Sequence, residues 1–223
     1  MNKTDECYKR YLAILREELL LAMGCTEPIA VAYAAPTARS LLKKPEQIES
    51  CELLISGNII KNVKSVVVPN TGGMKGLEAA AAAGIAAGDE KAGLQVLSRI
   101  DEQQMEKISA FLEKCRFQVT AASTSKIFYI EIRLQTPHES ARTVIEDFHT
   151  NLTVTEYNGR QSGCVAPVCE QQSGEPETDR SQMTVEEILE FANMAELDDV
   201  RELLERQIRC NTAISEEGLK HPW

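Results

Sequence analysis

Five residues near the start of the chain, Gly24–Pro28, have the types and spacing that could support thiol chemistry. Gly24 suits the end of one helix, and Pro28 suits the first turn of the next. A thiol at a helix N-terminus feels the positive end of the helix dipole, which lowers its pKa and favours thiolate. Cys25 is therefore a candidate reactive thiol, or else a small hydrophobic residue at a turn. Glu27 is a candidate general base, or a cap for the helix that it precedes.

A second candidate is the segment Val66–Gly76, which has the order of a strand, a glycine turn and a helix start. Backbone amides at such a turn bind anions, including carboxylates and phosphates. The spacing is neither a Walker A loop nor a dinucleotide fingerprint, so an anion cradle and an ordinary turn both fit. The residues expected to face a ligand are Asn70, Thr71, Gly72 and Gly73.

A third candidate is the polar run of His149, Thr150 and Asn151 between two predicted strands. Such a run can line a pocket, although loops also carry these residues to form turns. The three histidines of the chain have no zinc spacing, so no zinc site is expected. Cys164 and Cys169 are expected to be structural. No motif marks a nucleophilic serine or a Schiff-base lysine, and no pyridoxal phosphate is expected.

Periodicity and turn residues predict the elements that must position these groups. The predicted helices span residues 4–23, 28–42, 74–87, 101–115, 184–195 and 198–214. The predicted strands span residues 50–56, 65–68, 117–121, 127–135, 141–147 and 153–157, the last four as an antiparallel meander. Pro36 should bend the second helix. Thr184 and Glu187 fit a capping box.

Composition points to an ordinary globular chain of 223 residues, 43% hydrophobic and 26% charged. Aromatic residues are only 5%, so the core should be aliphatic and alanine-rich. We predict an α+β fold in which Ala-rich helices pack on a mostly antiparallel sheet, followed by a short acidic helical segment. The expected divisions are an α+β domain of residues 1–170, a polar linker of residues 171–182, and a helical segment of residues 183–223.

The net charge and the cysteine pattern restrict which partners the chain is expected to bind and which cellular compartment it is expected to occupy. The net charge is −10, and most of it lies in residues 160–223, which hold six Lys and Arg against fourteen Asp and Glu. Such an acidic chain repels phosphate backbones, so nucleic acid is not an expected partner. No apolar run approaches the ~20 residues that cross a bilayer, so no membrane partner is expected. Seven scattered cysteines without a CxxC pair favour free thiols in a reducing cytoplasm.

Four stretches together resemble a known enzyme family. Gly24–Ala30 resembles the opening motif of the iron–sulfur L-cysteine desulfidase family, which is related to the alpha chain of iron–sulfur L-serine dehydratase. Val68–Leu77 resembles its glycine motif, and His149–Asn151 its mid-chain polar motif. Cys210–Leu219 resembles the stretch that precedes the family's second half. These matches extend over nearly the whole chain.

The resemblance implies a pyridoxal-independent carbon–sulfur lyase that converts L-cysteine to pyruvate, ammonia and hydrogen sulfide. In that family an oxygen-sensitive [4Fe-4S] cluster acts as a Lewis acid on the leaving group. Cys25 matches the family's N-terminal active-site cysteine, which acts as a base or as a ligand near the cluster. The resemblance implies that Thr26 and Glu27 contact the substrate beside it.

The chain also departs from the family pattern. The cluster cysteines of the family lie in a second half, which would begin where this chain ends at Trp223. The other six cysteines do not match those positions. Phe148 stands where the family often has Gly, and Pro36 interrupts an Ala run. We therefore expect the N-terminal half of such an enzyme, as a designed fragment, a truncated gene product or one part of a split enzyme.

The resulting expectation is a half-site completed by the missing half or by a homo-oligomer partner. Asn70–Gly73 would hold the substrate carboxylate, and His149–Asn151 would orient polar groups nearby. The cluster would not be assembled by this chain alone. Two alternatives stay open: a non-catalytic binding or assembly domain, and an L-serine dehydratase-type ammonia-lyase.

Overall fold

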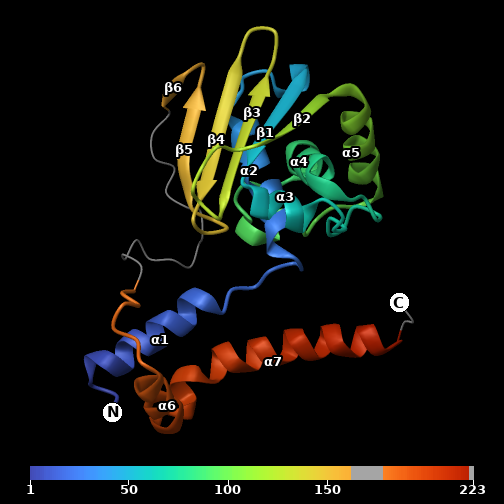
Figure 1. The fold of residues 1–223 in the computed structure, drawn as a ribbon. Coiled ribbons are helices and arrows are strands. Elements are labelled where there is room, and N and C mark those ends of the chain that lie inside the picture. The colour runs from blue at the N-terminus through green and yellow to red at the C-terminus, as the bar shows by residue number, and fades with distance from the viewer. Residues whose placement is uncertain (162–177, 221–223) are drawn as a thin grey trace. The chain divides into compact units, whose positions relative to one another are not determined.

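The computed structural model describes residues 1–161 and 178–220, and contacts divide the chain into two units (Figure 1). The larger unit contains residues 21–170, and the smaller unit combines residues 1–20 with residues 171–223. The first helix therefore groups with the C-terminal helices, whereas the predicted division placed it in a domain of residues 1–170. Of the predicted linker, residues 171–177 lie outside the described residues.

The larger unit is built on one sheet with the strand order β2-β1-β3-β4-β5-β6. Its strands are β1 (Ser50–Ile55), β2 (Arg116–Ala121), β3 (Tyr129–Gln135), β4 (Ser140–Glu146), β5 (Leu152–Tyr157) and β6 (Arg160–Gln161). Only the β1–β2 pair is parallel among these neighbours, which confirms the predicted α+β fold with a mostly antiparallel sheet. The predicted meander is wrong at its first strand. The chain between β1 and β2 makes a helical crossover, so β2 returns parallel to β1 at the edge of the sheet.

Four helices belong to the larger unit: α2 (Thr26–Leu41), α3 (Gly57–Val63), α4 (Gly76–Ala87) and α5 (Glu102–Lys114). Two 3-10 turns, Pro45–Gln47 and Gly93–Gln95, complete the helical structure described there. α5 begins at a capping box, in which the side chains of Asp101 and Gln104 each accept a hydrogen bond from the other's backbone amide. This reciprocal pair satisfies two amides that a helix start leaves free, so α5 is specified locally.

Residues 65–68, predicted as a strand, do not join the sheet. Val67 forms an isolated bridge with Lys75, and the amide of Val68 donates to the carbonyl of Met74. Val67 and Val68 therefore pair with the residues just after the glycine turn. Their backbone groups are hydrogen-bonded within this segment and do not bond to the sheet. α3 was not predicted from the sequence, and α4 begins two residues later than predicted.

Close packing of α2 and α4 forms the centre of the core. Both helices are rich in alanine and largely buried, and the buried residues of β1 pack in the same cluster. Gly84 of α4 makes the approach possible, since a Cβ there would lie 2.2 Å from the carbonyl oxygen of Ala32. α2 continues through Pro36, and the bend predicted at this residue stays a prediction. These small residues let the two helix backbones come closer than larger side chains would allow.

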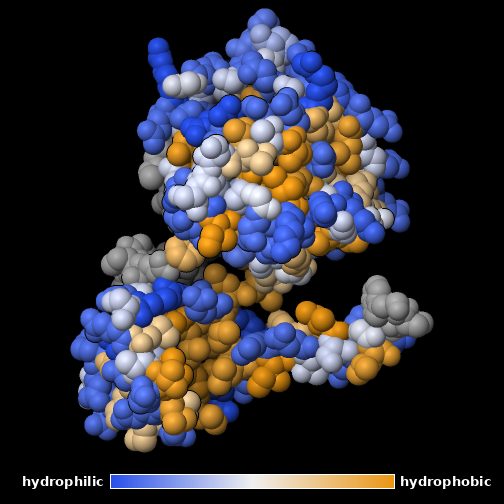
Figure 2. All heavy atoms as spheres, in the orientation of Figure 1, coloured by the Kyte–Doolittle hydropathy of each residue, from blue (hydrophilic) through white to orange (hydrophobic). Residues whose placement is uncertain are grey.

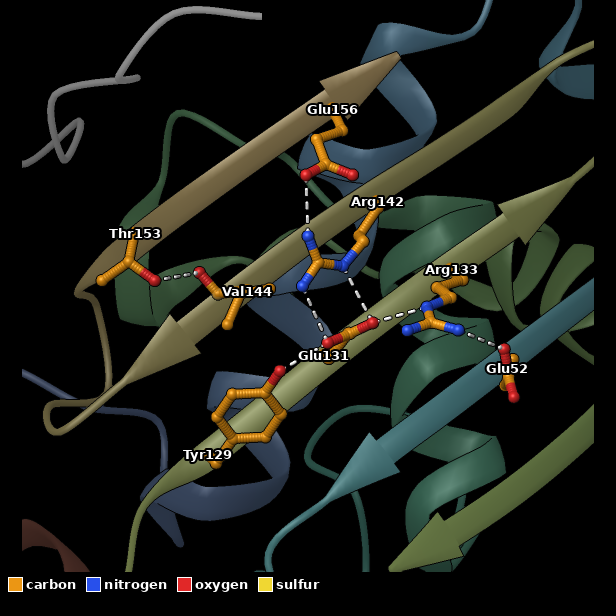
Figure 3. Close-up of polar contacts among 8 residues, drawn as sticks. All are labelled: Glu52, Tyr129, Glu131, Arg133, Arg142, Val144, Thr153 and Glu156. Atoms are coloured by element: carbon orange, nitrogen blue, oxygen red, sulfur yellow. Dashed lines mark hydrogen bonds and ion pairs between the residues drawn. The ribbon is translucent and has the colours of Figure 1, made fainter. Parts of the chain in front are cut away.

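The opposite sheet face carries a network of charged side chains, with the helices behind it (Figure 3). Its centre is Glu131, whose side chain is only 2% exposed. Arg142 donates to both carboxylate oxygens, Nε to Oε1 at 2.9 Å and Nη2 to Oε2 at 3.1 Å. Tyr129 and Arg133 donate to the same carboxylate. Burial opposes ionisation of Glu131, but these donors lower its pKa to about 2.

The smaller unit contains α1 (Glu6–Glu18), α6 (Val185–Met194) and α7 (Leu197–Lys220). Its core gathers on Phe191, whose ring centroid lies 5.2 Å from that of Tyr8 and 5.5 Å from that of Tyr11. Val200 of α7 is buried in the same cluster. The predicted helical segment is therefore present. No helix among residues 1–161 and 178–220 is long and apolar enough to cross a membrane.

The bounds of two helices in the smaller unit differ from the prediction. α1 ends at Glu18, well before residue 23, and α7 continues past residue 214 to Lys220. Half of the predicted capping box at α6 is formed, namely the bond from the amide of Glu187 to the Thr184 hydroxyl at 3.2 Å. The Glu187 carboxylate accepts instead from Arg10 at 3.1 Å, so a tertiary contact replaces the local one.

Substitution of Gly84 by Ala should test the close contact between α2 and α4. The added methyl group would collide with the Ala32 backbone, so we expect a loss of about 1–3 kcal/mol or more in the free energy of unfolding. Urea unfolding followed by circular dichroism measures this loss. Gly57→Ala is the matched control, because a Cβ there meets nothing within 4 Å. Equal stability of the two variants would contradict the contact.

Substitution of Glu131 by Gln should show how much the charged network contributes. We expect a loss of about 1–3 kcal/mol at pH 7, because Arg142 keeps a partly buried charge with Glu156 alone as its carboxylate partner. The folded pKa of Glu131 is about 2, below its unfolded value, so its contribution is present above about pH 4.5 and disappears toward pH 2. Wild-type stability should thus fall more steeply than that of the variant over this range. Glu52→Gln, in a more exposed pair with Arg133, is the control and should change stability little.

Candidate functional site

The candidate site lies at one end of the sheet, where α2 begins. Cys25 is the residue before α2, and Glu27 lies in the first turn of that helix. Asn62 of α3 donates from Nδ2 to Oε1 of Glu27 at 3.2 Å. His149, in the turn between β4 and β5, lies close enough to Glu27 for their charges to interact. Three of the residues singled out from the sequence are therefore brought together.

Cys25 and Glu27 form a thiol–carboxylate pair, with Sγ donating to Oε2 at 3.2 Å. Burial, together with this hydrogen bond and the negative charge, raises the pKa of the Cys25 thiol. Burial opposes ionisation of Glu27, but hydrogen bonds from Cys25, from its own amide and from Asn62 lower its pKa. The expected lowering of the Cys25 pKa is therefore wrong for the resting pair, because burial and the adjacent carboxylate both favour the neutral thiol. Thr26, between the two, is the first residue of α2.

His149 and Asn151 have different surroundings within the same turn. The His149 ring packs edge-on against Phe128, with centroids 4.6 Å apart. Burial lowers the pKa of His149, and the charge of Glu27 opposes that effect. A neutral imidazole at pH 7 can accept or donate a proton. Asn151 instead donates from Nδ2 to the carbonyl of Glu146 at 2.9 Å, so its side chain holds the turn.

The glycine turn lies beside the residue that precedes Cys25. A Cβ on Gly24 would be 3.6 Å from Cγ of Pro69, which brings the two segments into contact. Asn70, Gly72 and Gly73 have positive φ angles of 59°, 68° and 95°. The amides of Asn70, Gly72 and Gly73 donate no hydrogen bond to an acceptor in the described part of the chain, whereas that of Thr71 closes a turn onto Val68. Successive free amides in such a turn can bind a carboxylate.

The polar side chains of this turn are already used within the loop. Asn70 donates from Nδ2 to the carbonyl of Leu97 at 3.1 Å. Thr71 is 1% exposed and donates its hydroxyl to the carbonyl of Val68 at 2.7 Å. Any ligand of the turn would therefore meet backbone amides rather than these side chains. Thr150, in the β4–β5 turn, is half-buried.

The described residues around Cys25 do not fit a [4Fe-4S] cluster. The other described cysteines are Cys7, Cys51, Cys115 and Cys210. Cys51 and Cys115 are buried, and the other two belong to the smaller unit. Across residues 1–161 and 178–220, no three His, Cys, Asp or Glu side chains converge to hold a metal ion. Cys164 and Cys169 lie outside the described residues.

Asn62 is the site residue that the sequence analysis missed. It lies on α3, a helix of seven residues with Ile59 and Val63 buried on one side. The spacing of four between these two residues was the available signal, since such pairs share a helix face. Ser56, a residue type favoured before a helix start, was a second signal.

Substitution of Glu27 by Gln should make the Cys25 thiol more reactive. The change removes the negative charge that helps to raise the thiol pKa, so more thiolate is present near neutral pH. We expect alkylation of Cys25 by iodoacetamide at pH 7.5 to become several-fold faster, measured by mass spectrometry of the Cys25 peptide. Glu46→Gln, at an exposed position, should leave the rate unchanged. A slower rate in the Glu27 variant would contradict the assigned ionisation states.

No family model and no solved structure matches the chain. Relatives of known sequence do match it. A UPF0597 protein of Desulfitobacterium hafniense (strain Y51) is 41% identical over 222 residues, which cover 99% of this chain and 50% of the relative. One of Finegoldia magna is 40% identical over 218 residues, covering 96% of this chain and 51% of the relative. The chain spans about half the length of the curated relatives it matches. It is thus similar, almost from end to end, to about half of a UPF0597 protein.

Proposed function

We propose that this chain forms half of the active site of a lyase that eliminates hydrogen sulfide from L-cysteine. The observation that carries the proposal is the convergence of Cys25, Glu27 and His149 at the start of α2, where Gly24 contacts Pro69 of the glycine turn. These residues lie in three of the four stretches whose sequences resemble the L-cysteine desulfidase family. The similarity to about half of a longer protein supports a site that a second half completes.

The reaction removes a proton from the α-carbon of L-cysteine and releases the sulfur as HS⁻. The electron pair of the broken C–H bond forms a Cα–Cβ double bond while the Cβ–S bond breaks. The resulting enamine takes a proton at Cβ to give an imine, and water hydrolyses the imine to pyruvate and ammonium. A base near the α-carbon and a group that holds the carboxylate are the requirements this chain would meet.

The residues of this chain have matching roles. The free amides of the glycine turn would bind the substrate carboxylate and fix the α-carbon near Cys25. Glu27 would orient the Cys25 side chain through their hydrogen bond, and the thiolate form of Cys25 would remove the α-proton. Asn62 would position the Glu27 carboxylate through its hydrogen bond to Oε1. His149, neutral at pH 7, would exchange a proton with Glu27 or with the leaving sulfide.

The cofactor in this proposal comes from the family resemblance. A [4Fe-4S] cluster would supply a Lewis acid for the departing sulfur. Because the described residues offer no ligand set around Cys25, its ligands would belong to the second half. The roles given above for Cys25, Glu27 and His149 do not pass through the cluster.

Reconstitution of both halves tests this function. The chain is co-expressed anaerobically, with iron and sulfide, beside the half of the Desulfitobacterium hafniense relative that it does not match. We expect sulfide and pyruvate release from L-cysteine only when both halves are present. Cys25→Ala should reduce this rate by about 100-fold or more, because the proposed base is lost. Cys210→Ala, in the smaller unit, is the matched control and should retain the rate.

Each contrary result points to a different error. Full activity of the chain alone would contradict the half-site, and an unchanged rate in the Cys25 variant would contradict the role of that thiol. A preference for L-serine over L-cysteine would favour the ammonia-lyase alternative. Association of the halves without turnover of either amino acid would favour the assembly domain.

A further inference from the structure

The smaller unit leaves much of its apolar surface uncovered. Its buried hydrophobic residues are Tyr8, Tyr11, Ile14, Phe191 and Val200. Its exposed large hydrophobic residues are Leu20, Val185, Ile188, Leu189, Met194, Leu197, Ile208, Ile214 and Leu219. Figure 2 shows hydrophobic residues gathered over the surface of this unit. An apolar surface of this kind on a small unit is typical of an interface.

The pattern along α7 concentrates this surface on one side of one helix. At 100° per residue, its Leu, Ile and Val side chains fall within roughly half of the helix circumference. These residues are Leu197, Val200, Leu203, Leu204, Ile208, Ile214 and Leu219. Val200 is buried and Leu203 and Leu204 are half-buried, so the first turns pack within the unit. We call the exposed members, Leu197, Ile208, Ile214 and Leu219, the α7 apolar face.

The far part of α7 has little else to hold it as a helix. Ile208, Ile214 and Leu219 are 64%, 70% and 87% exposed. Arg206 donates from Nη2 to the carbonyl of Leu19 at 2.7 Å. Beyond it, Asn211 donates to the carbonyl of Gln207 and Lys220 pairs with Glu217, both within α7. A helical extension of three to four turns is marginal in water without tertiary packing. Burial of its apolar side against a partner would supply that packing.

We propose that the α7 apolar face is the docking surface for the half of a UPF0597 protein that this chain does not match. The relatives carry a counterpart of almost the whole chain, α7 included, within proteins about twice as long. They therefore supply both the helix and a covalently linked partner for it. The proposal rests on the second half invoked above and not on the reaction assigned to it.

Charge indicates the chemistry of the partner surface. Residues 178–220 contain five Lys and Arg against eleven Asp and Glu. Acidic residues outnumber basic ones on the side of α7 opposite its apolar face, which carries Glu202, Glu205, Glu216 and Glu217 beside Arg206, Arg209 and Lys220. A complementary partner surface is apolar at its centre and basic at its rim, so association should weaken as salt increases.

Binding between separately purified chains tests the docking surface without any assay of activity. The full chain is titrated with the unmatched half of the Desulfitobacterium hafniense relative, and the Kd is measured by sedimentation velocity. The relative's own two halves, expressed separately, are the positive control. We expect the double variant Ile208→Ser/Ile214→Ser to bind at least about tenfold more weakly than wild type. Ala213→Ser is the matched control, since it makes a similar change on the opposite side of α7 and should bind as wild type does.

Three results would overturn the proposal. The first is equal binding by the double variant and wild type, with α7 intact by circular dichroism. The second is the absence of binding by wild type while the relative's halves associate. The third is a dimer of this chain that the double variant disperses, which would assign the face to a second copy. Binding without lyase activity would overturn the proposed reaction and leave the docking surface intact.

Discussion

The close contact between α2 and α4 is the constraint on which the larger unit depends. Gly84 admits the Ala32 carbonyl where any side chain would collide, so α2 lies deep between α4 and the sheet. Side-chain hydrogen bonds also join α2 to the end of α4. Arg39 of α2 donates to the carbonyls of Ile85 and Gly88 at the end of α4. Because α2 is held along its length, its first turn presents the candidate site from a rigid element rather than from a loop.

Two carboxylates of the larger unit are ionised against the effect of burial, but by different partners. Glu131 accepts from two arginines and a tyrosine, and such complete pairing stabilises structure and leaves no capacity for proton exchange. Glu27 is held by a thiol, an amide side chain and its own backbone. Its principal partner, Cys25, can itself give up a proton. The difference separates a structural network from a pair suited to chemistry.

The two units differ in how much of their hydrophobic surface they bury. The larger unit buries most of α2 and α4 and one sheet face, and it covers Glu131 on the other face with paired side chains. The smaller unit buries a few aromatic and aliphatic residues and exposes more large hydrophobic residues than it covers. In proteins twice this length, additional chain is available to complete both the candidate site and the α7 apolar face.

The sequence by itself determined the local features. Helix-forming alanine runs, the Asp101 capping box and alternating apolar residues specified most helices and strands, because these signals act between residues close in the chain. Tertiary structure decided the parallel return of β2, the grouping of α1 with α7, the Glu131–Arg142 pair and the contact of Asn62 with Glu27. It also decided that Cys25 rests as a thiol. Each of these depends on which distant surfaces bury one another, and local periodicity carries no information about that choice.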